Sequence, residues 1–263
     1  MNRILAVAGV VLCRWSRRKE GYILAILMGL LLYGASALYP ATSANASLYL
    51  LDIALMLTWL FGWIVALHAG ATELPGEEER GTVFLLLAKP LNRAELIAGK
   101  WLGAWLASIL CSLVFQTMAL GAARLAGLTP PMDVLMQAGL LHLVSLGVLS
   151  AMALTFSTRF TRDASVSMAI VTALALYLLV PRIPQLAHYT DGWRAVAMDA
   201  LYYGLPHLEL FDLRRRVLHG FGPVSFPVLL ELVAYGAIWT SVWVLVAWLS
   251  YRNRLFRRDR MLD

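Results

Sequence analysis

Long apolar segments separated by short polar connections run along the whole chain of 263 residues. An α-helix rises 1.5 Å per residue, so about 20 apolar residues are needed to cross the hydrocarbon core of a bilayer. Six segments meet or approach this length, namely 21–39, 48–71, 101–123, 135–157, 164–180 and 228–251. The pattern predicts an all-α membrane protein with six transmembrane helices, in which residues 1–263 form a single domain.

The composition supports contact with lipid. Hydrophobic residues make up 60% of the chain and charged residues only 14%, whereas soluble domains carry about 25% charged residues. A net charge of +6 would suggest a nucleic-acid partner in a soluble protein. In a membrane protein we expect no nucleic-acid partner, because cytoplasmic loops are rich in Lys and Arg. Cys13 and Cys111 belong to no CxxC or Cys/His cluster, so the sequence indicates no metal site and no disulfide framework.

The basic residues predict the orientation of the chain. If both termini are cytoplasmic, 16 of the 22 Lys and Arg residues lie on the cytoplasmic side. The opposite orientation would place these charges outside, against the positive-inside rule. Six spans, an even number, put both ends on one side, so we expect a cytoplasmic N-terminus and a cytoplasmic C-terminus.

The first 20 residues form a further predicted helix. Ile4, Ala8, Val11 and Trp15 recur at helical spacing, and basic residues gather toward residue 19. This pattern is typical of a helix that lies in the cytoplasmic interface of the membrane. A cytoplasmic extension of the first span is the alternative.

Residues 181–227 form the one sizeable external segment, in which we expect short helices before the sixth span. Apolar residues from Trp193 onward follow an i, i+3, i+4 pattern after Gly192, which predicts an amphipathic helix. Pro206 opens a second predicted short helix, which contains Leu208, Phe211 and Leu218.

The connection between the second and third spans, residues 72–100, carries dense charges of both signs around a short apolar run at 83–87. That run is too short to cross a bilayer, and Pro90 disfavours helix at Lys89. Asn92 then begins a new helix as its N-cap, with Glu95 as its capping-box partner, and this helix continues into the third span. The short helix before Pro90 has two interpretations: a docking surface for a soluble motor, or a cover over the cytoplasmic ends of the spans.

A set of residues in and after this connection forms a recognisable pattern. It comprises Glu79, Arg80, Gly81, Thr82, Leu86, Leu87, Pro90, Arg93, Glu95, Ile97, Gly99 and Lys100. The pattern resembles that of the ABC-2 type permeases, which are the membrane subunits of ATP-binding-cassette exporters. The interfacial helix, the six spans and the helices before the sixth span are also similar to that family. Within it, the chain is similar to the stand-alone permease subunits of the nitrous-oxide-reductase maturation type.

The resemblance implies a transporter membrane subunit that is not an enzyme. Two permease chains would pair, as a homodimer or alternatively as a heterodimer, and each would bind a separate ATPase subunit that holds ATP and Mg. No G-x-x-x-x-G-K-[ST] motif occurs in the sequence, so we expect this chain to bind no cofactor itself. The resemblance places the protein in the inner (plasma) membrane of a bacterial cell.

The resemblance also assigns the contacts with the ATPase. Residues 73–88, within the connection between spans two and three, would form a coupling helix in a groove of the ATPase, and the loop 158–163 would make a second contact. ATP binding would draw the ATPases together, and the coupling helices would carry that motion into the spans. The residues expected to take part are Glu77, Glu78, Glu79, Arg80, Gly81, Thr82, Phe84, Leu87, Pro90, Arg93, Lys100, Arg159 and Arg162.

Polar residues inside the predicted spans are candidates for the transport pathway, because they are costly to bury in lipid. They are Asp52, Gln116, His142 and Glu231. For Asp52 and Glu231, near external span ends, the alternative is contact with headgroups or with external arginines. For Gln116 and His142, which lie deeper, the alternative is hydrogen bonding between packed helices. We expect His68 to be a structural hydrogen-bonding group.

Two other functions compete with transport. A scaffold or mechanotransmitting subunit would use the motion of an ATPase to act on periplasmic partner proteins, and the external segment is compatible with this. An intramembrane enzyme would need a catalytic constellation, but the sequence contains no HExxH, no GxSxG and no paired aspartates in its spans.

Overall fold

The computed structural model describes residues 3–38, 46–76, 92–189 and 192–252. Seven long helices make up most of this part of the chain. They are α1 (Arg3–Ser16), α2 (Glu20–Leu38), α3 (Ala46–Thr72), α6 (Arg93–Leu125), α7 (Met132–Ser157), α8 (Arg162–Leu179) and α12 (Phe226–Arg252). Five short helices lie between α8 and α12: η1 (Val180–Arg182), α9 (Ile183–Ala187), α10 (Trp193–Gly204), η2 (Leu208–Phe211) and α11 (Arg214–His219).

The six predicted spans are confirmed as helices long and apolar enough to cross a membrane within the described residues. Five of them correspond to α2, α3, α6, α7 and α12. In the fifth span, helical geometry continues past the predicted end at Val180, through η1 and α9, to Ala187. Pro181 and Pro184 stand in the first turns of η1 and α9, where a missing N–H is tolerated.

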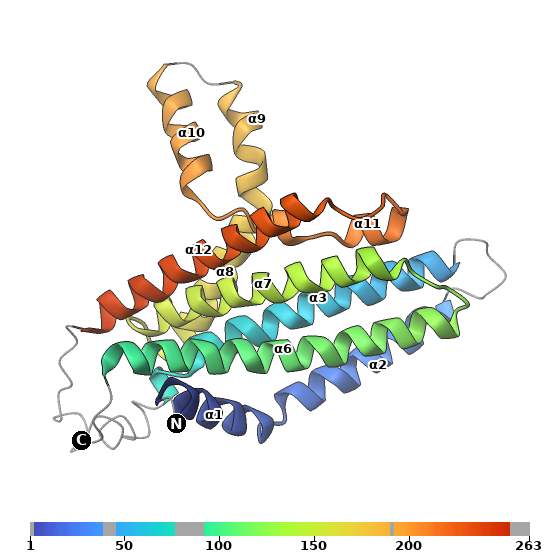
Figure 1. The fold of residues 1–263 in the computed structure, drawn as a ribbon, viewed down its shortest axis with the longest axis horizontal. Helices are drawn as coiled ribbons and strands as arrows, with labels where there is room; N and C mark the ends of the chain where they lie inside the picture. Colours follow the sequence, from blue (N-terminus) through green and yellow to red (C-terminus); the bar gives the residue numbers. More distant parts are fainter. Residues whose placement is uncertain (1–2, 39–45, 77–91, 190–191, 253–263) are drawn as a thin grey trace.

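The spans form a bundle with α3 at its centre. One core cluster packs α3 against α7 and α8, and a second packs α3 against α2 and α6. The crossing of α3 and α7 is close because α3 has a glycine there: a Cβ on Gly70 would lie 2.5 Å from the Ser150 carbonyl oxygen. The start of α1, the start of α6 and the end of α12 lie together at one end of the bundle, which we call the terminal end (Figure 1). We call the opposite end, where the chain passes from α6 to α7, the distal end.

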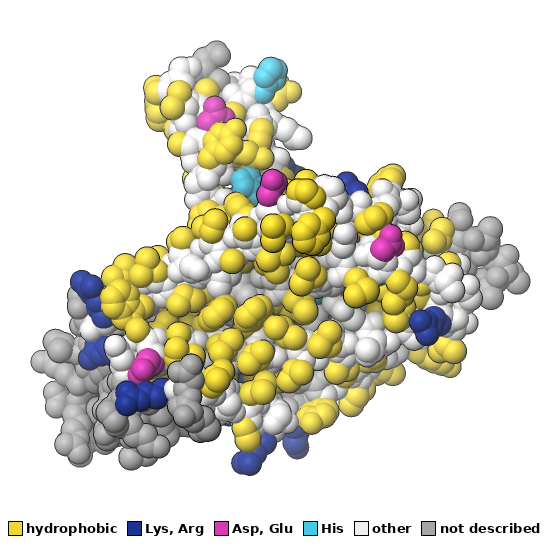
Figure 2. All heavy atoms as spheres, in the orientation of Figure 1, with side chains coloured by type: hydrophobic (Ala, Val, Ile, Leu, Met, Phe, Trp, Pro, Cys, Tyr) yellow, Lys and Arg dark blue, Asp and Glu magenta, His cyan; other side chains and the backbone are white. Residues whose placement is uncertain are grey.

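The surface of the bundle fits a lipid environment. Figure 2 shows hydrophobic side chains across the middle of the visible face of the bundle, and charged side chains mainly along its margins. Large apolar residues on α2 and α12, such as Tyr22, Ile26, Leu230 and Ile238, are well exposed. Apolar side chains are expected at such positions on a surface that faces acyl chains.

The N-terminal helix is a helix separate from the first span, because the chain bends at 17–19 between α1 and α2. It packs along the first half of α6. Gly99 and Gly103, one turn apart on α6, allow this close approach. A Cβ on Gly99 would lie 2.7 Å from the Val7 Cβ, and a Cβ on Gly103 would lie 2.5 Å from the Val11 Cβ. The interfacial position of α1 stays a prediction.

The segment before α12 differs in part from the prediction. The helix predicted after Gly192 is present as α10, but none of its residues is buried. α9 and α10 pack on each other and project away from the bundle (Figure 1). The single helix predicted after Pro206 is wrong, because the chain forms η2 and α11 with a break at Asp212. The Asp212 carboxylate accepts the backbone N–H of Arg214 at 3.1 Å, which holds the break.

Candidate functional site

A buried ion cluster joins three helices at the terminal end of the bundle. Glu73, just after α3, accepts hydrogen bonds through Oε2 from Lys100 Nζ of α6 at 3.2 Å and from Arg14 Nη1 of α1 at 3.2 Å. The side chains of Glu73 and Lys100 are each only 1% exposed. A buried charge needs such partners, because its desolvation is costly. The cluster therefore fixes the end of α3 against α1 and α6.

The start of α6 is held by its own cap. The Asn92 side chain accepts from the backbone N–H of Ala94 at 3.3 Å, and the Glu95 carboxylate accepts the N–H of Asn92 at 2.9 Å. The predicted capping box is therefore confirmed. The next residue, Arg93, donates to the carbonyl oxygens of Tyr251 (3.0 Å) and Arg252, so the start of α6 also binds the end of α12.

α1 is tied to the same region by further polar contacts. Arg3 lies 3.7 Å from Glu95 in an ion pair, and Arg18 donates to the Thr72 hydroxyl at 3.3 Å. His68 Nδ1 lies 3.1 Å from Glu20 Oε2, which joins α3 to the start of α2 and gives His68 the hydrogen-bonding contact expected of it. The ends of α1, α2, α3, α6 and α12 therefore form one connected group around the two ends of segment 77–91.

The residues predicted to contact the ATPase fall into three groups. Lys100 and Arg93 serve internal contacts, with Glu73 and with α12 respectively. Arg159 is exposed and Arg162 is half-buried, at the turn between α7 and α8. The others lie outside the described residues: Glu77, Glu78, Glu79, Arg80, Gly81, Thr82, Phe84, Leu87 and Pro90.

A second polar site lies nearer the distal end, where the chain after η2 meets the bundle. Asp212 and Arg214 form a bidentate ion pair, with Arg214 Nη2 at 2.7 Å from Oδ2 and Nε at 2.8 Å from Oδ1. The Tyr177 hydroxyl of α8 donates to Asp212 Oδ2 at 2.8 Å. The Arg214 guanidinium also lies 4.5 Å from the ring centroid of Trp59 on α3, a cation–π contact.

The electrostatics of this pair favour its charged form. Burial raises the pKa of the Asp212 carboxyl, but the hydrogen bonds and the charge of Arg214 outweigh burial and hold that pKa below its ordinary value. The same partners raise the pKa of Arg214 against the opposing effect of burial. Asp212 and Arg214 therefore stay ionised near neutral pH and fix η2 and α11 to the bundle.

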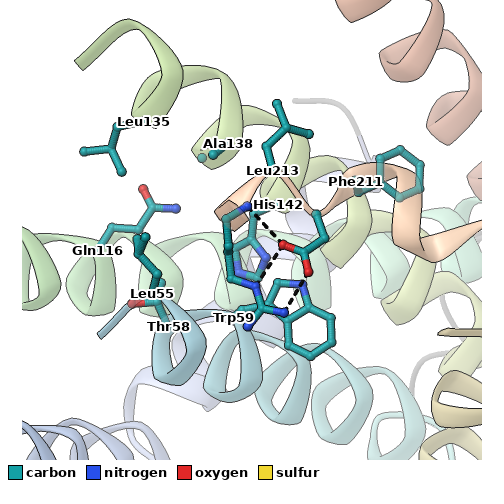
Figure 3. A pocket seen from close by; sticks show the side chains of 12 residues that line it. Leu55, Thr58, Trp59, Gln116, Leu135, Ala138, His142, Phe211 and Leu213 are labelled. Atoms are coloured by element: carbon teal, nitrogen blue, oxygen red, sulfur yellow. Dashed lines mark hydrogen bonds and ion pairs between the residues drawn. The ribbon is translucent and has the colours of Figure 1, made fainter. Parts of the chain in front are cut away.

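A pocket of about 40 Å³ lies beside this ion pair. α3, α6, α7 and the chain from η2 to α11 supply its lining, namely Leu55, Thr58, Trp59, Gln116, Leu135, Ala138, Gly139, His142, Phe211, Asp212, Leu213 and Arg214. Figure 3 shows Gln116 and Leu135 on one side of the pocket and Phe211 on the other. His142 is 6% exposed, and neither of its ring nitrogens has a hydrogen-bond partner in the described part of the chain.

The candidate pathway residues are thus divided by the structure. Gln116 and His142, from different spans, line the same pocket, whereas Asp52 and Glu231 are exposed on the bundle surface. Sequence reasoning missed Asp212, Arg214, Tyr177 and Trp59, since no motif marks them. Within the described ranges, no three His, Cys, Asp or Glu side chains gather as a metal site.

Comparison with known proteins shows that most of the chain matches one protein family. A family model described as ABC-2 family transporter protein matches residues 21–251. The chain is also 30% identical over 113 residues to the probable ABC transporter permease protein NosY of Pseudomonas aeruginosa. That alignment spans 43% of this chain and 39% of the relative.

Proposed function

The chain belongs to the ABC-2 transporter family and is a membrane subunit of an ABC transporter, and we propose that it exports a cargo by converting the motion of a separate ATPase subunit into movement of its spans. ATP and Mg would bind to that ATPase. Two copies of this chain would form the translocating unit, with their termini on the cytoplasmic side of the bacterial inner membrane.

The buried cluster of Glu73, Lys100 and Arg14 is the observation that carries this proposal. The proposed coupling helix, residues 73–88, lies between the end of α3 and the cap of α6. Because Glu73 and Lys100 form an ion pair at 3.2 Å across these two boundaries, a force on the segment would act on α3 and α6 together. α6 then extends 33 residues, about 50 Å, toward the distal end.

α1 and α12 would move with this unit. α1 is packed on Gly99 and Gly103 of α6 and is paired through Arg14 with Glu73. α12 is held at its end by Arg93. Lys100 and Arg93 would thus transmit force between helices inside the chain. Direct contact with the ATPase would come from other residues, namely Glu79, Arg80, Arg159 and Arg162.

The proposal is tested by purifying the tagged chain in a mild detergent that preserves membrane complexes, identifying bound proteins by mass spectrometry and measuring ATP hydrolysis. The E79A/R80A variant removes one acidic and one basic residue of the proposed coupling helix. The matched control, R194A/D199A, also removes one basic and one acidic residue, but from α10, where both side chains are exposed. We expect an ATPase to co-purify with the wild type and the control, and to be lost or uncoupled in E79A/R80A. A wild-type chain that binds no ATPase would overturn the proposal.

A second candidate function is mechanical action on a periplasmic protein. The helical hairpin of α9 and α10 favours it, because the hairpin projects from the bundle and leaves Trp193, Val196 and Tyr203 between 69% and 80% exposed. Such apolar and aromatic surface fits a protein partner. A transport assay in vesicles separates the two functions, because a mechanotransmitting subunit would hydrolyse ATP with its partner and move no cargo.

A further inference from the structure

We propose that His207 and Glu209 form a proton-binding site at the base of the α9–α10 hairpin, and that the bound proton holds the hairpin in its position on the bundle. Both residues stand where the chain leaves the hairpin, shortly after α10 ends at Gly204 (Figure 1). The family relationship assigns no role to either residue, and the site does not depend on the proposed coupling to an ATPase.

The His207 ring makes a hydrogen-bond contact at each of its nitrogens. Nε2 lies 3.0 Å from the backbone carbonyl oxygen of Tyr202, in the last turn of α10, and Nδ1 lies 2.9 Å from Oε1 of Glu209. The His207 side chain is only 11% exposed. Its backbone N–H donates to the Tyr235 hydroxyl of α12 at 2.9 Å. His207 therefore joins the end of α10, η2 and α12 at one point.

These contacts require one proton more than a neutral imidazole and an ionised carboxylate carry together. A carbonyl oxygen only accepts, so Nε2 of His207 must carry a hydrogen. A neutral imidazole has no second N–H, and its bare Nδ1 would face the Glu209 carboxylate as acceptor against acceptor. Either His207 is protonated on both nitrogens, or Glu209 is protonated and donates to Nδ1. In both forms the pair holds the same additional proton.

Loss of that proton would make the contact unfavourable. Nδ1 of His207 and Oε1 of Glu209 would stand 2.9 Å apart with no hydrogen between them. The second carboxylate oxygen, Oε2, is buried and has no hydrogen-bond partner among the described residues. An ionised Glu209 would thus lose the cation that offsets its desolvation. The end of α10 would also lose a positive charge, which is favourable at a helix C-terminus. We therefore expect the pair to separate when the proton leaves.

The other titratable groups around the imidazole come from four helices. The Tyr202 ring of α10 lies edge to face with it, with centroids 4.4 Å apart, and the Tyr235 hydroxyl of α12 accepts the backbone N–H. α7 and α8 also pack on η2. Their titratable groups there interact with Asp212 instead, Tyr177 through a hydrogen bond and His142 electrostatically. Within the described ranges, the charged contact of the imidazole is therefore with the Glu209 carboxyl.

The hairpin depends on this base for its position. α10 packs on α9, and none of its residues is buried. Separation of His207 from Glu209 and from the Tyr202 carbonyl would therefore free the hairpin to turn relative to α12. On the predicted external side of the membrane, the site would respond to the pH outside the cytoplasm.

Distances between two spin labels test the proposal. Val196→Cys on α10 and Ile238→Cys on α12, both at exposed positions, are introduced into a full-length C13S/C111S chain. The labelled chain is diluted with an excess of unlabelled chain before reconstitution in lipid nanodiscs, so that each measured pair of labels lies in one chain. Double electron–electron resonance then gives the distance distribution from about pH 5 to pH 8, the range in which histidine side chains change charge.

We expect a narrow distribution at low pH and a broader one at high pH. The displaced population should be about tenfold larger at high pH, since a hydrogen bond to a charged group contributes at least that factor. Glu209→Gln should stay narrow throughout, because its amide can accept from Nδ1 or donate to it without titrating. A wild-type distribution that does not change with pH would overturn the proposal, as would a Glu209→Gln chain that still broadens at high pH.

His188→Gln is the matched control, because it removes an exposed histidine at the end of α9. It should retain the pH dependence of the wild type, and loss of that dependence would place the proton at His188 instead. If the Glu209 variant does not fold, His207→Gln takes its place. A glutamine at 207 cannot titrate, so its distance distribution should be the same at every pH, and a distribution that still changed would count against the site.

Discussion

Glu73 and Lys100 stand 27 positions apart and on opposite sides of segment 77–91, yet their side chains meet at 3.2 Å with each only 1% exposed. A buried ion pair contributes little net stability compared with apolar packing, but breaking it leaves an uncompensated charge. Its role here is positional, since it holds the end of α3 against the start of α6.

The first prediction concerns this pair. Lys100→Met removes one of the two cations that the buried Glu73 carboxylate contacts among the described residues, and we expect a loss of about 3 kcal/mol in unfolding free energy. The double variant E73Q/K100M removes both charges and should recover much of that loss. Thermal unfolding in detergent, followed by tryptophan fluorescence, measures both effects. A double variant less stable than Lys100→Met would contradict the assignment.

Arg3→Ala is the control for that experiment. Arg3 and Glu95 are 3.7 Å apart, with side chains 56% and 31% exposed. Exposed pairs of this kind contribute roughly 0–1 kcal/mol, so Arg3→Ala should change the unfolding temperature little.

Much of this end of the bundle follows from the sequence. Asn92 and Glu95 stand at capping-box spacing before an apolar run, and the structure confirms both contacts. The burial of Glu73 and Lys100 could not be predicted from the sequence, because both residues belong to a stretch rich in charged side chains, which are usually exposed. Their burial depends on the packing of α1, α7 and α12 around the start of α6, which brings together residues far apart in the sequence. The spacing of Gly99 and Gly103 was the available signal for a close helix contact.

The second prediction tests the packing of α1 on α6. Gly103→Ala would place a Cβ 2.5 Å from the Val11 Cβ, which cannot swing aside. We expect α1 to shift from α6, with a loss of about 1–3 kcal/mol and faster tryptic cleavage near Arg14 and Arg17.

Gly9→Ala is the matched control, because Gly9 lies in α1 with nothing within 4 Å of an added Cβ. Alanine favours helix over glycine by about 1 kcal/mol, so this variant should be as stable as the wild type or more stable. Equal cleavage rates in the two variants would show that α1 does not depend on the Gly103 contact.

Less of the pocket beside Asp212 and Arg214 could be predicted from the sequence. Gln116 and His142 could be singled out as intramembrane polar groups, but their meeting in one pocket depends on how α6 and α7 are rotated. Asp212 and Arg214 belong to a loop that could have faced water. Their role arises from the ring of Trp59 and the hydroxyl of Tyr177, which come from two other helices.

The third prediction concerns the pH dependence of the Asp212 pair. Since Arg214 lowers the pKa of Asp212 in the folded chain, the stabilisation is fully present above the ordinary carboxyl pKa of about 4 and is lost as the pH falls through the lowered value. Asp212→Asn should cost about 1.5–3 kcal/mol at pH 7. The difference in unfolding temperature between wild type and Asp212→Asn should be constant from pH 7 to 5 and shrink below pH 4.

Asp199→Asn, at an exposed position on α10, supplies the comparison. It should change the unfolding temperature little at pH 7. A wild-type advantage over Asp212→Asn that persists undiminished at pH 3 would exclude the ion pair as its source.

The fourth prediction concerns Gln137 on α7, whose side chain binds both backbone groups of Val224. Its Nε2 donates to the Val224 carbonyl oxygen at 3.0 Å, and its Oε1 accepts the Val224 N–H at 2.8 Å. This double contact fixes the chain just before α12. Gln137→Ala leaves both backbone groups without the contact and should cost about 1–3 kcal/mol. Hydrogen exchange measured by mass spectrometry should become faster in residues 221–226 and remain unchanged in α6.

Gln137→Glu separates the two hydrogen bonds. Its carboxylate can still accept the Val224 N–H but cannot donate to the carbonyl oxygen, so its exchange rates should lie between those of the wild type and Gln137→Ala. Gln185→Ala, at an exposed position on α9, should leave residues 221–226 as protected as in the wild type. If Gln137→Ala left them equally protected, the path of the chain into α12 would have to be set by Pro223 and Pro227 instead, through their fixed backbone angles.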